Sequence, residues 1–496
     1  MKKQTKNIII ALAVLLVLGI AAAVLLMMPS ADDPYDVDAP TAQTQDEPFL
    51  LIDNEITDVK QVVIENGLVD ETWTLVPMMD ENAQEQNNTF TFKGWEDEAV
   101  VHTEALSAAR SFYTLYAVKD MGEVGDLADY GLDGEGTIKA VVEYLDGTKE
   151  TIIVGDAAGE STGRYTLYND KVYIAAFSEM LVQKQVDFID PSVLTIPIPD
   201  DSTLNGVTTE VENTMSHMRF SGKNYPEEIL LQKSEDPVLK YEVSEPIFTG
   251  ANETKIDEMI GQLMSITANA VAAVNATEDE LKVFGLDEPT AVIDFEINDE
   301  AHVIRLGAKL NGEYSLTIDD NDTVYIVAES NVDSWANNAL YDLRDGFVRL
   351  VNIFDVQKLT VEDASGKDVY DVERVKNEER STEELPYYDL SVTKDGKAID
   401  YKTAYQPFYT DMLSVYVLNE ALVEKPEGEP LFTASFEHAE NGGTEVVEYY
   451  ALPDNDRRCV AVVDGEAVGV VRMSDVEDLM AKKTAVGNFE AIAEAD

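Results

Sequence analysis

The sequence predicts an α+β fold, with an N-terminal transmembrane helix and an ectodomain of three related units, each an antiparallel sheet with packed helices. An uncharged apolar run, Ile8–Met28, lies near the start of the chain. Alternating apolar and polar residues, separated by turn residues, dominate the remainder. A similar order of strand, helix and hairpins recurs three times in it. We expect a cytoplasmic tip and transmembrane helix at 1–28, a flexible acidic linker at 29–48, and units at 49–189, 190–354 and 355–496.

The apolar run has the length and flanking charges of a membrane anchor. About 20 apolar residues cross a bilayer core. Lys2, Lys3 and Lys6 precede the run and acidic residues follow it, which places the N-terminus in the cytoplasm and the ectodomain outside. A cleaved signal peptide is the alternative, but its apolar core is usually shorter. The predicted anchor residues include Ile8, Ile9, Ile10, Leu12, Leu15, Leu16, Leu18, Leu25 and Met28.

The charge of the chain argues against nucleic-acid binding. There are 36 Lys and Arg against 96 Asp and Glu, and three of the lysines precede the anchor, so the remainder carries 33 − 96 = −63. Nucleic acid and anionic lipid both need cationic partners. A solvated, repulsive surface that keeps an exported protein soluble explains the acidity.

Composition also limits the fold and its redox chemistry. Apolar residues make up 45% of the chain, so the ectodomain can form real cores, and its length favours more than one of them. Cys459 is the only cysteine, which excludes an intramolecular disulfide and suggests a bacterial envelope. The thiol lies in an apolar strand pattern, so we expect it to be buried and inert.

Each unit is expected to open with a strand and continue with a helix. The opening pattern, an Asp followed by apolar residues four and six positions later, occurs at Asp58, Asp190 and Asp355. The clearest helix pattern runs from Thr254 to Val274, with Thr254 and Asp257 as a capping box. Its counterparts are Thr103–Lys119 and Tyr405–Val423.

A short signature and a meander of four strands follow each helix. The signature is Gly131-Leu132-Asp133 in the first unit and Gly285-Leu286-Asp287, with Pro289, in the second. The third unit keeps only a Pro-Gly turn at 426–430. A closing helix is expected after each meander, with capping boxes at Ser330–Asp333 and Ser474–Glu477. The meander strands are predicted at 140–144, 151–154, 165–168 and 172–175, at 292–297, 302–306, 314–318 and 324–327, and at 432–437, 446–451, 459–463 and 468–472.

This order of motifs, completed by Leu343-Arg344-Asp345, resembles a bacterial family called domain of unknown function 4340. The resemblance covers most of the ectodomain, best from Asp58 to Val361, and the third unit departs from it. Family members typically have an N-terminal membrane helix, and their genes often lie beside those of gliding-motility-type ABC transporters. The resemblance therefore implies an accessory of a membrane export system, and it brings no catalytic residues.

No motif predicts catalysis, a cofactor or a metal site. Gly159-Glu-Ser-Thr-Gly163 matches the G-x-S-x-G sequence motif of a nucleophile elbow, but a strand rather than a helix is expected after it. The histidines His102, His217, His302 and His438 contain no zinc-binding pair. The acidic loops 319–322 and 454–456 lack the ligand spacing of an EF-hand, so turns explain them better than Ca²⁺. Trp73, Trp95 and Trp335 could line a groove, although core packing is the usual role of such residues.

We therefore expect a non-enzymatic, single-pass protein of the cell membrane with an extracytoplasmic ectodomain. Its expected role is that of a binding or scaffold protein, with the bilayer and ABC transporter membrane subunits as partners. A hydrolase acting on envelope polymers and a structural spacer are the alternatives. The ligand, the oligomeric state and a stacked or compact arrangement of the units stay open.

Overall fold

A computed structural model describes residues 48–78, 88–159, 163–199, 202–204, 207–209, 213–235, 239–381, 386–439, 442–453 and 455–492. The predicted anchor Ile8–Met28 and the linker before residue 48 lie outside these ranges. Within them, no helix combines the length and apolarity needed to cross a bilayer.

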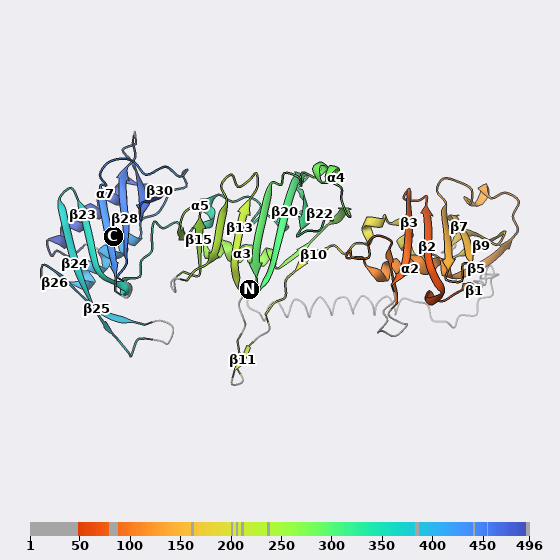
Figure 1. Cartoon of the computed structure of the whole chain (residues 1–496), viewed down its shortest axis with the longest axis horizontal. Helices are drawn as coiled ribbons and strands as arrows, with labels where there is room; N and C mark the ends of the chain where they lie inside the picture. The colour runs from red at the N-terminus through yellow and green to blue at the C-terminus, as the bar shows by residue number, and fades with distance from the viewer. Residues whose placement is uncertain are drawn as a thin grey trace, which may run out of the picture.

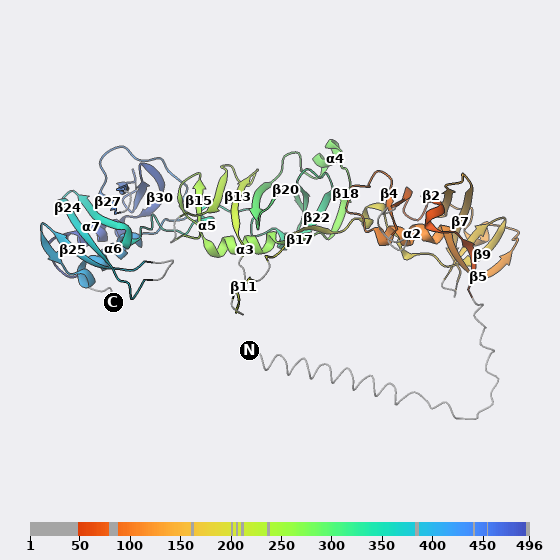
Figure 2. The ribbon, with the colours of Figure 1, turned by 60° about the horizontal axis from the view of Figure 1, so that its bottom comes forward.

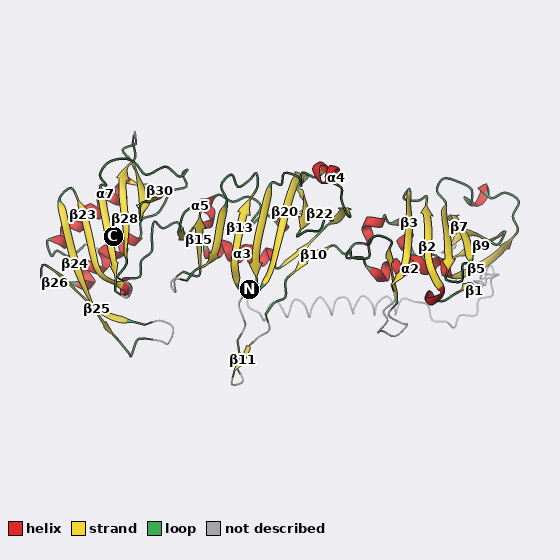
Figure 3. Cartoon of the chain, viewed as in Figure 1, coloured by secondary structure: helices red, strands yellow, loops and turns green. Residues whose placement is uncertain are grey.

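Three large antiparallel sheets, of nine, nine and eight strands, lie in a row along the long axis of the molecule (Figure 1). Helices lie on one face of each sheet, behind the strands in Figure 3, and the view in Figure 2 brings them forward. The described fold therefore consists mainly of antiparallel sheet with few helices. We call the residues around the three sheets module 1 (48–189), module 2 (190–344) and module 3 (345–492).

Module 1 contains one long helix, α2 (His102–Tyr113), and four 3-10 turns. Its strands are β1 (Phe49–Asp53), β2 (Val59–Asn66), β3 (Glu71–Met78), β4 (Thr89–Phe92), β5 (Thr114–Gly122), β6 (Ile138–Tyr144), β7 (Lys149–Ala157), β8 (Arg164–Tyr168) and β9 (Lys171–Ala175). The turns are η1 (Ile56–Asp58), η3 (Ala128–Tyr130), η4 (Glu179–Val182) and η5 (Gln185–Phe188).

Module 2 adds two small two-stranded sheets to the large one. Its helices are α3 (Glu253–Leu263), α4 (Glu278–Val283), η6 (Glu329–Asn331) and α5 (Leu340–Leu343). Its strands are β10 (Ser192–Thr195), β11 (Ser202–Leu204), β12 (Val207–Thr209), β13 (Met215–Ser221), β14 (Ile229–Lys233), β15 (Tyr241–Glu245), β16 (Thr249–Gly250), β17 (Ser265–Thr267), β18 (Ala270–Ala273), β19 (Ala291–Ile297), β20 (Glu300–Leu310), β21 (Glu313–Ile318) and β22 (Val324–Ala328).

Module 3 ends in the longest helix of the described residues, α7 (Met473–Gly487). Its other helical elements are η7 (Ile353–Asp355), the π-helical turn η8 (Tyr401–Tyr405) and α6 (Gln406–Leu413). Its strands are β23 (Val356–Asp363), β24 (Gly366–Lys376), β25 (Tyr388–Lys394), β26 (Lys397–Ile399), β27 (Phe432–His438), β28 (Thr444–Ala451), β29 (Arg458–Val463) and β30 (Glu466–Arg472).

The three large sheets share one strand order. A three-stranded meander (β2–β4, β13–β15, β23–β25) pairs through its first strand with the first strand of a four-stranded meander (β6–β9, β19–β22, β27–β30). The long helix lies between the two meanders in sequence. A bulge interrupts the start of the joining strand in every module, at Val59/Gln61, Met215/His217 and Val356/Lys358. The three modules therefore agree in strand order and in the position of this bulge, so their backbones are similar as well as their sequence motifs.

All twelve predicted meander segments lie on strands. Many of them show the predicted alternation, although β29 is buried continuously from Cys459 to Val463. In β19, every second residue from Ala291 to Ile297 is buried. This is the period-two pattern of a strand with one face on the core. Cys459 is fully buried in β29, as predicted, and burial raises the pKa of its thiol to about 11.

The predicted long helices were too long. Helix α3 ends at Leu263, and the following apolar residues form β17 and β18, which pair with β10 and β22. Likewise α2 ends at Tyr113 and continues as β5, while α6 ends at Leu413. Residues 265–273 and 114–119 form strands because they pair with strands distant in sequence, although their apolar spacing continues the helical pattern.

Several predicted starts of elements were also wrong. The strand after Asp190 is β10, which lies outside the large sheet, and β13 occupies the place of β2. Asn252, rather than Thr254, caps α3 by accepting a hydrogen bond from the Lys255 N–H. The expected boxes at Ser330 and Ser474 do not form: η6 has no side-chain cap, and neither does α7.

Two junctions with the same hydrogen bonds connect the modules. The Asp190 N–H donates to Ala99 O, and Phe188 O accepts from the Val101 N–H. In the same way, the Asp345 N–H donates to Gly250 O, and Leu343 O accepts from the Asn252 N–H. The residues between these pairs, Ile189 and Arg344, therefore occupy equivalent positions.

Candidate functional site

The repeat signature forms a tight turn in modules 1 and 2. Gly131 and Gly285 have positive φ angles of 67° and 70°, a conformation that favours glycine. Leu132 and Leu286 follow and are buried, whereas Asp133 and Asp287 are exposed. Pro289 only offers its carbonyl to the Lys223 N–H. The signature residues therefore perform turn and packing roles in these modules.

A second glycine faces each of these turns, and the sequence reasoning missed it. A Cβ on Gly155 would lie 2.3 Å from Tyr130 O, and one on Gly307 would lie 2.3 Å from Phe284 O. Module 3 lacks both the Gly-Leu-Asp turn and a glycine in β28. An isolated glycine within a strand often marks such a close approach of two backbones, so the signal was present.

The histidines do not form a catalytic group in the described part of the chain. Three of them contact acids: His217 with Asp294 at 3.5 Å, His302 with Asp319 at 3.0 Å, and His438 with Glu445 at 3.0 Å. His102 Nδ1 lies 3.2 Å from Phe90 O. These contacts place no hydroxyl or thiol nucleophile beside an imidazole.

The other sequence candidates also have structural explanations. Strand β8 follows the Gly159–Gly163 loop, whereas a nucleophile elbow requires a helix there; Ser161 itself lies outside the described residues. Asp319 accepts hydrogen bonds from the Val303 N–H and contacts His302, so its carboxylate is engaged. The described ranges contain no cluster of His, Cys, Asp or Glu suited to a metal, and Asp454 of the second acidic loop lies outside them.

The tryptophans pack into cores instead of lining a groove. Trp73 and Trp335 are fully buried. Trp95 packs partly buried against the core shared by modules 1 and 2. Core packing, the ordinary role, therefore accounts for these residues.

A polar cavity of about 1100 Å³ lies at one end of the module 1 sheet. Within it, Glu150 accepts hydrogen bonds from Tyr144 Oη at 2.5 Å and Tyr168 Oη at 2.8 Å, and Asn54 donates to Tyr144 Oη at 2.7 Å. Burial and the Glu150 hydrogen bond raise the pKa of Tyr168 to about 12, and they raise the pKa of Tyr144 as well. Both phenols therefore stay protonated near neutral pH and are unsuited to act as general bases.

A second cavity, of about 660 Å³, forms a groove between modules 2 and 3. Module 2 contributes the turn after β13, Pro246 after β15, and residues 337–344 in and around α5. Module 3 contributes the segment after α6 together with Gly469 of β30. Apolar side chains form much of its wall, namely those of Tyr225, Pro226, Ile229, Pro246, Leu340, Tyr341, Val417 and Leu422. Asn224, Asn337, Asn338 and Asn419 supply amide groups, and Glu227 and Glu420 supply carboxylates.

Arg344 lines this groove and connects the two modules. Its guanidinium donates to Val468 O of module 3 at 2.5 Å, to Phe347 O at 2.8 Å and to Thr249 Oγ1 at 3.1 Å. All three acceptors are neutral, the side chain is 3% exposed, and Nε has no acceptor. Burial lowers the pKa of Arg344, and the nearby charge of Asp345 only partly offsets this effect.

Asp345 is the one described carboxyl group with a resolved rise in pKa. Burial raises it, and the hydrogen bond from the Phe347 N–H opposes the rise. This Asp caps the turn into module 3 by accepting a hydrogen bond from the Phe347 N–H at 2.9 Å. Among the described residues, no hydrogen bond or ion pair joins it to a histidine or to a second carboxyl group. A raised carboxyl pKa in a cleft is typical of hydrolases, but here it belongs to a junction turn.

The helix-free sheet faces carry cross-strand ion pairs. Lys60 pairs with Glu143 at 2.7 Å in module 1, Arg219 with Glu245 at 2.8 Å in module 2, and Lys358 with Glu437 at 3.5 Å in module 3. Such exposed pairs are typical of a solvated face. The groove at the second junction is therefore the better candidate for a binding site.

Comparison with known proteins supports the family resemblance over part of the chain. Residues 241–414 match the model of a family described as Domain of unknown function (DUF4340). The matched part begins at β15, includes Arg344 and ends after α6, so it spans the second junction rather than the expected range from Asp58 to Val361. No curated protein and no solved structure matches the chain.

Proposed function

We propose that this chain is a membrane-tethered extracytoplasmic scaffold that binds a protein partner and serves an ABC-type transport system of the bacterial envelope. One observation carries the proposal: modules of one strand order stand in a row, joined by repeated hydrogen-bonded junctions, with a groove at the second (Figure 1). We infer that the modules are three versions of one unit, a design that typically creates extended binding surfaces.

The membrane tether is part of the proposal and is supported by sequence. The run Ile8–Met28 is long enough to span a bilayer, and lysines precede it while acids follow it. An anchor there would hold module 1 nearest the membrane and place module 3 farthest along the chain. The link to an ABC transporter is supported by the family resemblance alone.

A binding role suits the described residues better than hydrolysis or spacing. A hydrolase would need convergent acid, base or nucleophile groups. In the first cavity Glu150 is hydrogen-bonded to two tyrosines, and in the groove Glu420 is paired with Arg458. A pure spacer would have no use for a groove between two modules. The groove therefore favours a ligand.

A crosslinked pull-down of the full chain from native membranes tests the proposal. The expected result is recovery of a transporter membrane subunit. A matched control carries Leu15→Asp and Leu16→Asp in the anchor, which should release the chain from the membrane and lose the subunit. If the wild-type chain recovers no transporter component, the transporter link is wrong. If it stays in the membrane fraction with both Asp substitutions, the anchor is wrong.

A further inference from the structure

We propose that the polar cavity of module 1 binds a neutral saccharide chain. This inference goes beyond the proposed scaffold role, because it assigns a ligand of another chemical class to a module that takes no part in the groove. It rests on a hydrogen-bonded network at the ends of three strands, on the contrast with the other two modules, and on the character of the cavity wall.

Three adjacent strands bring the network together on the core-facing side of the sheet. Tyr144 is the last residue of β6, Tyr168 is the last residue of β8, and Glu150 lies in β7 between these strands. Ile152 and Val154 of β7 are fully buried, so the two-residue period of a strand turns Glu150 toward the same side. A carboxylate therefore occupies a position where the next residues on that face are apolar.

The network fixes a mixture of hydrogen-bonding groups on the cavity wall. Glu150 accepts hydrogen bonds from Tyr168 Oη at 2.8 Å and from Tyr144 Oη at 2.5 Å. Asn54 donates to Tyr144 Oη at 2.7 Å and approaches Glu150 at 3.5 Å. Carboxylate and amide oxygens each have two lone pairs, so Glu150 and Asn54 still have acceptor sites for the hydroxyl groups of a ligand.

Module 2 has no such network at the same positions. Strands β19 and β21, the counterparts of β6 and β8, end in Ile297 and Ile318, which are 0% and 8% exposed and belong to the core. By the pairing register of the meander, His302 holds the place of Glu150. The fold therefore does not need two tyrosines and a carboxylate to close this end of the sheet.

Module 3 places a carboxylate at this position but neutralises it. By the same register, Glu445 is the counterpart of Glu150. Arg349 Nε lies 2.5 Å from Glu445 and His438 Nε2 lies 3.0 Å from it. In module 1 only neutral donors contact the carboxylate, and a cavity of about 1100 Å³ lies beside it. This difference points to a ligand of module 1.

The cavity wall is unsuited to anionic and apolar ligands. It contains one ammonium group, that of Lys149, which already lies 3.4 Å from Glu143. An anionic ligand would therefore meet an excess of negative charge. Pockets for apolar ligands are lined mainly by hydrophobic side chains, whereas this wall is mostly polar. The carboxylates of the wall are those of Asp58, Asp146, Glu150 and Asp170.

A neutral, hydroxyl-rich ligand suits this wall better than a cation does. The three aspartates are exposed, so water and salt screen their charges, and the half-buried Glu150 already accepts hydrogen bonds from both phenols. Each hydroxyl group of a sugar both donates and accepts, as the wall requires. The apolar C–H face of a sugar ring can pack on Leu145, which is 67% exposed, and on the ring of Tyr168.

Binding of the full chain to an array of immobilised oligosaccharides tests this inference. The chain is purified in a detergent without a sugar headgroup, so that the detergent does not compete. The array carries neutral glycans, glycans with uronic acid or sulfate groups, and glycans with free amino groups. We expect binding to neutral glycans alone, and isothermal titration calorimetry then gives the affinity for the best of them. Binding to no neutral glycan, or stronger binding to amino glycans, would overturn the inference.

Variants of the network show whether the bound glycan occupies this cavity. The combined substitutions Tyr144→Ile, Glu150→His and Tyr168→Ile install the residues of module 2 and should lower the affinity at least tenfold. Tyr168→Phe keeps the ring and removes one hydroxyl group, so a loss of about two- to tenfold is expected, and this variant decides the question if the triple variant does not fold. Tyr165→Phe, on the same strand but outside the cavity, should bind as the wild type does. Unchanged affinity in Tyr168→Phe, or an equal loss in Tyr165→Phe, would overturn the assignment to this cavity.

Discussion

Lys483 and Asp363 show at the scale of single residues how module 3 holds its last helix. Their side chains are 2% and 5% exposed, and Lys483 Nζ lies 2.5 Å from Asp363 Oδ1. The ammonium also donates to Ser365 Oγ at 3.0 Å and Gly366 O at 2.6 Å. This contact ties α7 to the turn between β23 and β24, so a buried charge pair fixes a helix that the sequence analysis described by its capping box alone.

We predict that Lys483→Met lowers the free energy of unfolding of module 3 by about 3–5 kcal/mol, because it leaves Asp363 buried without a counter-charge. Urea unfolding of the full chain measures the loss. The neighbouring Lys482→Met is the control: this lysine is 23% exposed and pairs with Asp411 and Asp478, so about 0–1 kcal/mol is expected. Equal losses in the two variants would contradict the role of burial.

The pair should also make module 3 sensitive to acid. Burial alone would raise the pKa of Asp363, but hydrogen bonds from Lys483 and Ser365 outweigh it and hold the pKa below its ordinary value of 3.8. A carboxyl group whose pKa is lower in the folded state stabilises the fold above its unfolded pKa. That contribution is therefore present above about pH 4 and is lost as the pH falls further.

At the scale of elements, the Gly-Leu-Asp turn and its facing glycine form one packing device. The turn places Phe284 O where a Cβ on Gly307 would lie 2.3 Å away, and module 1 repeats the arrangement with Tyr130 O and Gly155. Module 3 has lost the turn and the glycine together. We expect the turn and the facing glycine to occur together, because the glycine is needed only where the turn carbonyl lies against the strand.

We predict that Gly307→Ala destabilises module 2 by about 1–3 kcal/mol, because the added methyl group forces the turn away from β20. Thermal unfolding measures the change. Gly261→Ala is the matched control: a Cβ at this position in α3 meets nothing within 4 Å, and alanine in a helix should stabilise by about 0.5–1 kcal/mol. A neutral or stabilising Gly307→Ala would show that the approach is not a real constraint.

The same elements show what sequence alone could reveal. Alternating apolar and polar residues predicted meander strands that have one face on a core, such as β19, whereas β29 is buried on both faces and lacks this alternation. The ends of α2 and α3 could not be predicted in this way, because β5, β17 and β18 are decided by pairing with β1, β9, β10 and β22. The groove was also beyond reach, since its walls come from five separated stretches of chain. Arg344 was noticed only as part of a family motif, and its burial gives that motif a physical meaning.

At the scale of the whole molecule, the two junctions differ in how they are packed. Modules 1 and 2 share one continuous cluster of buried apolar residues, whereas module 3 has a core of its own. At the second junction Arg344 reaches Val468 O across a boundary that also contains the groove. The second junction should therefore depend on one side chain more than the first does.

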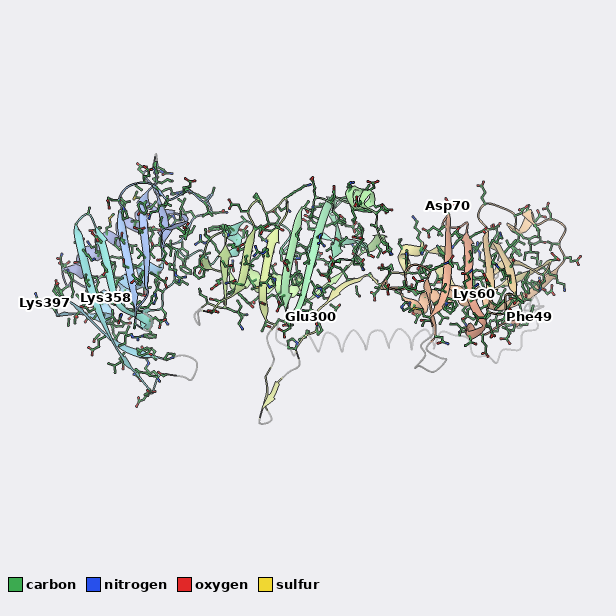
Figure 4. All side chains as sticks on the ribbon, in the orientation of Figure 1. Phe49, Lys60, Asp70, Glu300, Lys358 and Lys397 are labelled. Carbon is green, nitrogen blue, oxygen red and sulfur yellow. The ribbon has the colours of Figure 1, made fainter. Side chains whose placement is uncertain are left out.

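We predict that Arg344→Met broadens the distribution of distances between modules 2 and 3 and leaves modules 1 and 2 unchanged. Spin labels on cysteines replacing Lys60, Glu300 and Lys358, one in each module (Figure 4), allow both distances to be measured by pulsed electron resonance on the full chain. The native Cys459 is fully buried and should not react with the label.

In Arg344→Met the Glu300–Lys358 distance distribution should widen, because the lost donor leaves Val468 O unsatisfied and removes a hydrogen bond between the modules. Arg305→Met, which removes a guanidinium bonded only to Asp319 O within module 2, should alter neither distribution. Broadening of both distances in Arg344→Met would mean that the loss of Arg344 loosens both junctions and that the shared core of modules 1 and 2 gives no extra rigidity.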